Sequence, residues 1–105
     1  MQTQALKDHV KAICDELKSA GDKQDEQAKT AVRAAMTHVE EARKAIETQT
    51  KSDATEDNKE RQQMLDHLQT VAQSGATTLK ADGANLRKGI RDMLNATEDI
   101  LTKDM

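Results

Sequence analysis

Residues 19–29, SAGDKQDEQAK, decide which helical fold this sequence predicts. They place a glycine and an aspartate, Gly21 and Asp22, inside an otherwise regular helical pattern. Reversal of the chain at Gly21 would give a compact bundle of shorter helices. Continuation of one helix through Gly21 would give a long hairpin, which could serve a different function.

The apolar residues on either side of Gly21 favour one continuous helix. Leu17 and Ala28 are 11 residues apart, which is three helical turns without loss of phase. A reversal at Gly21 would not require this phase to be kept. The spacing therefore predicts a helix over about residues 3–50. Its apolar stripe is Leu6, Val10, Ile13, Leu17, Ala28, Val32, Ala35, Val39, Ala42 and Ile46.

The second half of the chain has a coiled-coil period. Its apolar or small residues follow one another in steps of three or four, which average 3.5 residues. This pattern predicts a second helix over about residues 56–103. Its seam is Leu65, Leu68, Ala72, Gly75, Leu79, Gly83, Leu86, Ile90, Met93, Thr97 and Ile100. A flanking row, Val71, Ala76, Leu94 and Leu101, makes the seam wide enough for a four-stranded interface.

The centre of the chain is polar and predicts the one real turn. Residues 48–60 contain no apolar residue except Ala54. Asp53, with Glu56 three residues later, is a signal for the start of a helix. We therefore place the turn at about residues 51–55. An antiparallel hairpin centred there sets Gly21 level with Gly83, so both are candidate kinks or hinges.

The predicted fold is all-α: a long, coiled-coil-like antiparallel helical hairpin that completes a four-helix bundle by dimerisation. Composition favours the dimer, because Leu, Ile and Val number only 16 of 105 residues and no aromatic residue is present. The strict periodicity argues against disorder. The alternative is a compact four-helix monomer, with the chain reversing at Gly21 and at Gly83.

Charge and composition narrow the classes of partner. Sixteen basic residues are interspersed with nineteen acidic ones, and no aromatic residue could stack on a base. We therefore expect no nucleic-acid partner. No signal peptide or membrane-spanning run is visible. The single cysteine, Cys14, cannot form an internal disulfide, and these features together predict a cytoplasmic protein.

Residues with catalytic potential are few. Cys14 and His9 are five positions apart and would point away from each other on a helix, so they predict no nucleophilic pair. His38 and His67 would lie level in the hairpin, with Glu41 one turn away, and a metal site is conceivable there. Histidines beside a helix interface are, however, usually polar residues at its edge. We therefore predict no enzyme, no catalytic residue, no cofactor and no metal.

The sequence thus predicts a non-enzymatic protein–protein interaction module: a scaffold, adaptor or small chaperone. It would act by forming a homodimer or by binding a helical partner. The predicted interface is Ala28, Ala31, Val32, Ala35, Met36, Val39, Leu65, Leu68, Leu79, Leu86, Ile90 and Met93.

Two alternative functions stay open. The first is an amphipathic protein that opens on lipid or granule surfaces, similar to apolipoprotein-like and phasin-like proteins. It is not favoured, because interfacial helices usually carry Trp or Phe on the apolar face. The second is a small secreted helical hairpin, which the chain resembles in length and architecture only.

Overall fold

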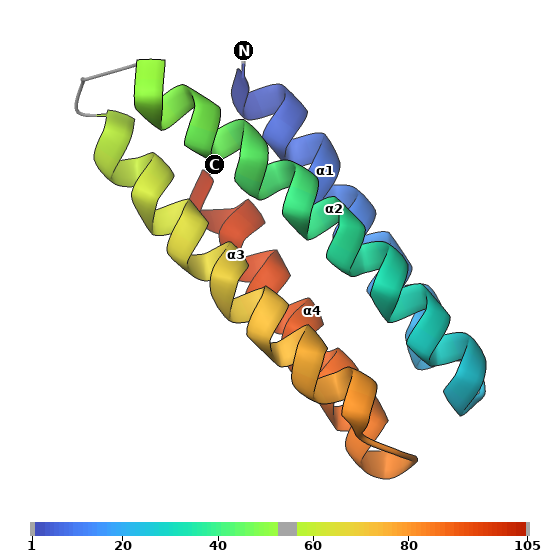
Figure 1. The fold of residues 1–105 in the computed structure, drawn as a ribbon. Helices are drawn as coiled ribbons and strands as arrows, with labels where there is room; N and C mark the ends of the chain where they lie inside the picture. Colours follow the sequence, from blue (N-terminus) through green and yellow to red (C-terminus); the bar gives the residue numbers. More distant parts are fainter. Residues whose placement is uncertain (1, 53–56, 105) are drawn as a thin grey trace.

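The computed structural model contains four α-helices: α1 (Gln2–Gly21), α2 (Asp25–Ser52), α3 (Asp57–Lys80) and α4 (Ala84–Asp104). It describes residues 2–52 and 57–104, with side chains for residues 6–48 and 61–102. Each helix packs against the next, and α4 packs back against α1 (Figure 1). This is the arrangement of an up-and-down four-helix bundle. The described residues form no strand, so the all-α prediction is confirmed.

The prediction of one helix running through Gly21 is wrong. Helix α1 ends at Gly21, and the chain turns before α2 begins at Asp25. The backbone N–H groups of Asp22 and Lys23 close this end of α1, donating to carbonyl oxygens of the preceding turn at 3.3 and 3.1 Å. The chain reverses here, because α2 packs against α1.

The prediction of one helix running through Gly83 is wrong in the same way. Helix α3 ends at Lys80, α4 begins at Ala84, and Gly83 has a φ of 59°. The molecule measures 45 Å along its longest axis. A continuous helix of about 45 residues would be roughly 70 Å long. The four-helix alternative, with reversals at both glycines, is therefore the observed arrangement.

Burial gives the physical reason for the two reversals. A two-helix hairpin leaves part of each apolar stripe exposed until a second copy covers it. Folding back at both glycines brings all four stripes around one core within a single chain, with no cost in translational freedom. The buried apolar residues are Leu6, Val10, Ile13, Cys14, Leu17, Ala20, Ala28, Ala31, Val32, Ala35, Val39, Ala42, Ile46, Leu68, Val71, Leu86, Ile90, Met93 and Ile100. A second copy is not needed to bury them, and dimerisation stays a prediction.

The predicted turn at about residues 51–55 lies largely outside the described residues, and its first two residues are helical. Helix α2 extends to Ser52 and α3 begins at Asp57. The predicted capping residues Asp53 and Glu56 lie outside the described residues.

The pairing of residues across the bundle differs from the predicted pairing, in which Gly21 lies level with Gly83. In the structure, Asp25 contacts Gly83 and Lys29 contacts Asp82. This pairing is shifted along the chain by up to about one heptad.

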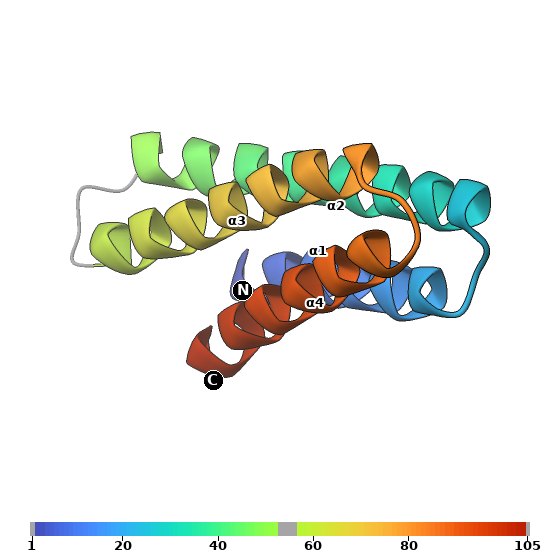
Figure 2. The ribbon, with the colours of Figure 1, turned by 90° about the horizontal axis from the view of Figure 1, so that it is seen from below.

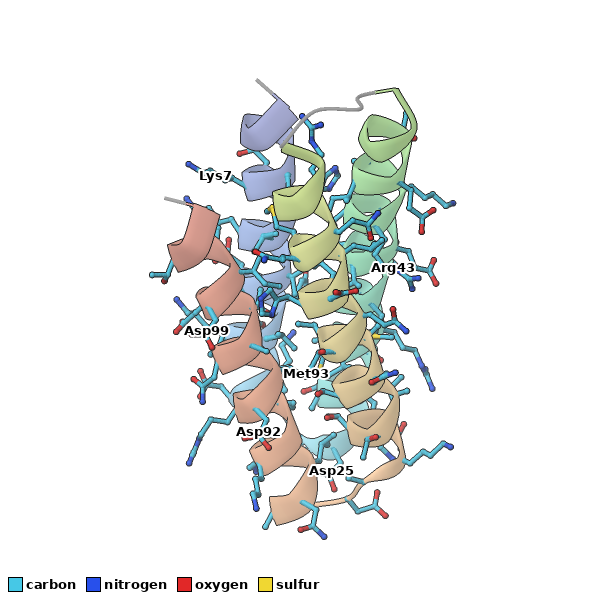
Figure 3. All side chains as sticks on the ribbon, turned by 90° about the vertical axis from the view of Figure 1, so that its left-hand side faces the viewer. Lys7, Asp25, Arg43, Asp92, Met93 and Asp99 are labelled. Atoms are coloured by element: carbon cyan, nitrogen blue, oxygen red, sulfur yellow. The ribbon has the colours of Figure 1, made fainter. Side chains whose placement is uncertain are left out.

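The end of the bundle that carries the α1–α2 and α3–α4 connections is cross-linked by polar contacts (Figure 1). The Gly83 N–H donates to Asp25 Oδ2 at 3.2 Å, and Lys29 Nζ lies 3.1 Å from Asp82 Oδ1. Figure 3 shows Asp25 at this end of the molecule. These contacts tie the first helix pair to the second.

The helices form two layers. Figure 2 shows α2 beside α3 in one layer and α1 beside α4 in the other. Between the layers, Gly89 of α4 lies against Thr78 of α3, and a Cβ at Gly89 would overlap the Thr78 side chain. Thr78 is buried, and its hydroxyl donates to the Ser74 carbonyl oxygen at 2.7 Å. Because this bond satisfies the hydroxyl within its own helix, Thr78 can lie in the core.

Candidate interaction surface

The predicted interface residues divide into two groups in the structure. Nine of the twelve are buried in the core of this chain: Ala28, Ala31, Val32, Ala35, Val39, Leu68, Leu86, Ile90 and Met93. Figure 3 shows Met93 pointing between the helices, whereas Asp92 and Asp99 point outward. The intramolecular core therefore explains the apolar pattern of these nine. They cannot touch a partner while the four helices stay together.

The other three predicted residues, Met36, Leu65 and Leu79, are half-buried and pack against the core. Leu65 and Leu79 share a row on α3 with Ala72, which is also half-buried. These three lie seven residues apart, so the row runs nearly parallel to the helix axis. It keeps an apolar strip of α3 partly open to solvent.

The rotation of α3 shows which side of the bundle this row occupies. Thr78 faces α4, because it contacts Gly89. Leu79 and Ala72 lie on the opposite flank of the α3 core stripe, which is Leu68, Val71 and Gly75. The row therefore lies on the side of α3 that faces α2.

A matching row comes from α2. Met36 lies against Gly75 of α3, where a Cβ would overlap the Met36 sulfur. Lys29 is seven residues before Met36 and contacts Asp82, and Arg43 is seven residues after it. Helical periodicity thus places all three on the α3-facing side of α2. We call the combined set the α2–α3 edge: Lys29, Met36, Arg43, Leu65, Ala72 and Leu79.

The α2–α3 edge has an apolar centre with a basic residue toward each end. Among the residues that the structure describes, the buried Nε atom of Arg43 has no hydrogen-bond partner. A partly exposed apolar row on one helix face is the type of surface that receives a second helix. An acidic group on that second helix would complement Arg43, whereas Lys29 already pairs with Asp82.

The opposite side of the bundle carries a comparable but smaller row. Leu94 and Leu101 of α4 are half-buried and seven residues apart. Gly89 faces α3, and both leucines lie on the other flank of the α4 core stripe, toward α1. Among the described side chains of α4, Leu94 and Leu101 are the large apolar ones on this α1–α4 edge. It serves as a matched comparison for the α2–α3 edge.

Cys14 is unsuited to nucleophilic chemistry. The residue is 4% exposed, and burial raises the pKa of its thiol from 9.0 to about 11. Glu98 and Asp15 act in the same direction, and Lys18 partly offsets them. The reactive species of a cysteine is the thiolate, which this environment disfavours. The absence of a catalytic role for Cys14 stays a prediction.

The histidines are arranged differently from the sequence expectation. The predicted grouping set His38 level with His67, on the assumption of a long hairpin. Because the chain reverses at Gly21, His38 instead lies with His9 of α1 and with Glu41. His67 belongs to α3 and is not part of this group.

The two candidate hinges are turn residues rather than kinks in continuous helices. Gly21 is the exposed last residue of α1, with no atom within 4 Å of a Cβ built on it. Gly83 lies between α3 and α4. Their predicted shared level is approximately correct, because both connections lie at one end of the bundle (Figure 1).

Four residues of these two groups could not be named from the sequence: Lys29, Arg43 and Ala72 of the α2–α3 edge, and His9. Ala72 and Arg43 were not predicted as interface residues, although heptad steps from Leu65 and Met36 lead to them. His9 was considered only in relation to Cys14. Its position beside His38 follows from the α1–α2 reversal, which the preferred fold did not contain.

The fold places the chain in the class of four-helix bundles. No family model, curated protein sequence or solved structure matches it. Over the described residues, no helix offers a stretch that is both long and apolar enough to cross a bilayer.

Proposed function

We propose that this chain is a non-enzymatic protein–protein interaction module that associates through its α2–α3 edge. The observation that carries the proposal is the half-buried apolar row Leu65, Ala72 and Leu79, completed by Met36 of α2. Heptad spacing makes this row straight enough to line one face of another helix.

The proposed occupant of the edge is a second copy of the chain. A copy would bring the same apolar row, and a two-fold axis would let the two rows face each other. The dimer would join two closed four-helix bundles rather than two open hairpins.

The proposal includes the absence of catalysis and a cytoplasmic location. The buried Cys14, with its thiol pKa raised to about 11, supports the first point. Its unpaired state supports the second, since a free thiol is compatible with a reducing compartment. The proposed role is that of a scaffold, adaptor or small chaperone.

Sedimentation velocity over a concentration series tests the proposal. We expect the wild-type chain to shift with concentration from its chain mass of 11.6 kDa toward twice that mass. The double variant Leu65→Gln/Leu79→Gln should stay monomeric over the same range, because it removes most of the large apolar surface of the edge. Thermal unfolding would confirm that each variant is folded.

The matched control is Leu94→Gln/Leu101→Gln, which makes the same chemical change on the α1–α4 edge. This control should associate like the wild type. A wild-type chain that stays monomeric throughout would rule out the second copy as the occupant. Equal loss of association in both double variants would show that the α2–α3 edge is not the interface.

A further inference from the structure

A group of metal-ligand side chains lies between α1 and α2, on a different side of the bundle from the α2–α3 edge. It consists of His9 from α1, with His38 and Glu41 from α2. One ligand atom from each residue lies within 4.8 Å of the other two. His9 Nδ1 and Glu41 Oε2 are already 3.5 Å apart.

The fold accounts for this grouping. His38 and Glu41 are three residues apart, so they lie on the same face of α2. The reversal after Gly21 sets α1 antiparallel to α2 and brings His9 to the same level. All three ligands therefore stand on regular helices, which hold a site in place better than loops do.

His38 supplies a second, independent observation. Its Nδ1 atom is buried and finds no hydrogen-bond partner in the described part of the chain. A buried polar atom without a partner is destabilising, and most such atoms in proteins are satisfied. Coordination of a cation through Nδ1 would satisfy this one.

The ligand chemistry fits a divalent transition metal. Two imidazole nitrogens and one carboxylate oxygen form a common Zn²⁺ ligand set, which leaves a fourth position for water. Zn–ligand bonds near 2.0–2.1 Å place tetrahedral ligand atoms roughly 3.3 Å apart. The 3.5 Å pair is close to this spacing. Glu41 is free to adjust, since its side chain is 51% exposed.

We propose that His9, His38 and Glu41 form a Zn²⁺-binding site that clamps α1 to α2. The partly exposed side chains of His9 and Glu41 leave the outer side of the site open for a water ligand. The metal would act as a structural cross-link far from the Gly21 turn. The metal would hold α1 against α2 at a level of the bundle that is distant from the turn joining the two helices.

Isothermal titration calorimetry with ZnCl₂ tests this site on the full chain at neutral pH. We expect one Zn²⁺ per chain. His9→Gln, His38→Gln and Glu41→Gln should each weaken binding at least about tenfold, because even loss of an outer-shell partner costs roughly 10–100-fold. Glu41→His should keep or tighten binding, because it replaces the carboxylate with a third imidazole.

Two controls separate this site from other zinc ligands in the chain. His67→Gln and Cys14→Ala should each leave the affinity within about twofold, a change under 0.5 kcal/mol. The melting temperature of each metal-free variant would show whether it folds. The shift produced by Zn²⁺ would then be measured against that baseline.

Some outcomes would overturn the proposal. One is a wild-type chain that binds no Zn²⁺ at millimolar concentration. Another is an affinity that His67→Gln or Cys14→Ala lowers as much as His9→Gln does. If the three ligand variants fold and bind Zn²⁺ as tightly as the wild type, the metal lies elsewhere. The histidine resonances in NMR spectra give a second readout, because only those of His9 and His38 should shift with Zn²⁺.

Discussion

Gly21 and Gly83 both lie at helix connections, yet their backbone conformations differ. Gly83 has a φ of 59°, in the left-handed region that penalises residues with a Cβ. Gly21 has no positive φ, and a Cβ there would meet no atom within 4 Å. Only Gly83 needs to be glycine for conformational reasons.

This difference predicts opposite effects for the same substitution. Gly83→Ala should lower the free energy of unfolding by about 1–2 kcal/mol, because alanine is strained in the left-handed region. Gly21→Ala should raise it by about 0.4–1 kcal/mol, because the unfolded chain loses freedom and the folded chain gains no clash. Urea unfolding followed by circular dichroism measures both.

Asparagine gives a control at the left-handed position. Because Asn tolerates this conformation better than Ala, Gly83→Asn should be less destabilising than Gly83→Ala. Equal losses for Ala at both glycines would contradict this assignment. They would instead indicate that each turn needs flexibility, as a hinge would.

At the scale of the helices, the α1–α2 and α3–α4 connections are held together by a few specific contacts. Asp25 has two roles there. Its carboxylate accepts the Gly83 N–H at 3.2 Å, and it lies in the first turn of α2, at the positive end of the helix dipole. Glu26 shares the second role only, since it is exposed and also in the first turn.

This comparison predicts a larger effect at Asp25. Asp25→Ala should cost about 1–2 kcal/mol of unfolding free energy, because it leaves the Gly83 N–H without its acceptor and removes a favourable charge. Asp25→Asn keeps an acceptor and should cost less. Glu26→Ala should cost at most about 1 kcal/mol, the value of the dipole interaction alone.

Thermal unfolding is the measurement, since 1 kcal/mol shifts the melting temperature of a domain of this size by about 4–8 °C. If Glu26→Ala shifts the melting temperature as much as Asp25→Ala, the cross-link to Gly83 contributes nothing. The neighbouring Lys29–Asp82 pair should contribute little, because the Asp82 side chain is 82% exposed.

The helical elements could be predicted from the sequence, but their rotation could not be fully resolved. The step pattern of three and four correctly marked α3 and α4 as amphipathic. However, the pattern assigned residues of two different rows of α3 to one seam. Leu68 and Gly75 are buried in the core, whereas Leu65 and Leu79 are half-buried. Val71, predicted as a flank, is fully buried. Which row faces inward depends on neighbouring helices that the sequence does not place.

At the scale of the whole molecule, the two chain reversals were the features that the sequence predicted least well. The 11-residue step across Gly21 is compatible with both folds, because two antiparallel helices can each rotate their own stripe toward a common core. The turn chemistry of Gly21 and Asp22 was the local signal for a reversal. The His9–His38 grouping depends on that reversal, so it could not be predicted from the preferred hairpin.

The burial of Cys14 makes the unfolding free energy of the whole bundle depend on pH. Its thiol pKa rises from 9.0 to about 11 on folding, mainly because the residue is buried. Below pH 9 the thiol is neutral in both the folded and the unfolded chain, so the full stability is present. Between pH 9 and 11 the unfolded chain ionises first, and stability is lost as the pH rises.

We therefore expect the unfolding free energy of the wild type to fall, relative to Cys14→Ala, by up to about 2–3 kcal/mol between pH 8 and 11. Comparison with Cys14→Ala cancels the titration of the lysines, which both proteins share. Urea unfolding at a series of pH values measures the difference. Parallel profiles would show that Cys14 ionises as readily in the folded chain as in the unfolded one. The bundle would then open to solvent around α1 without unfolding as a whole.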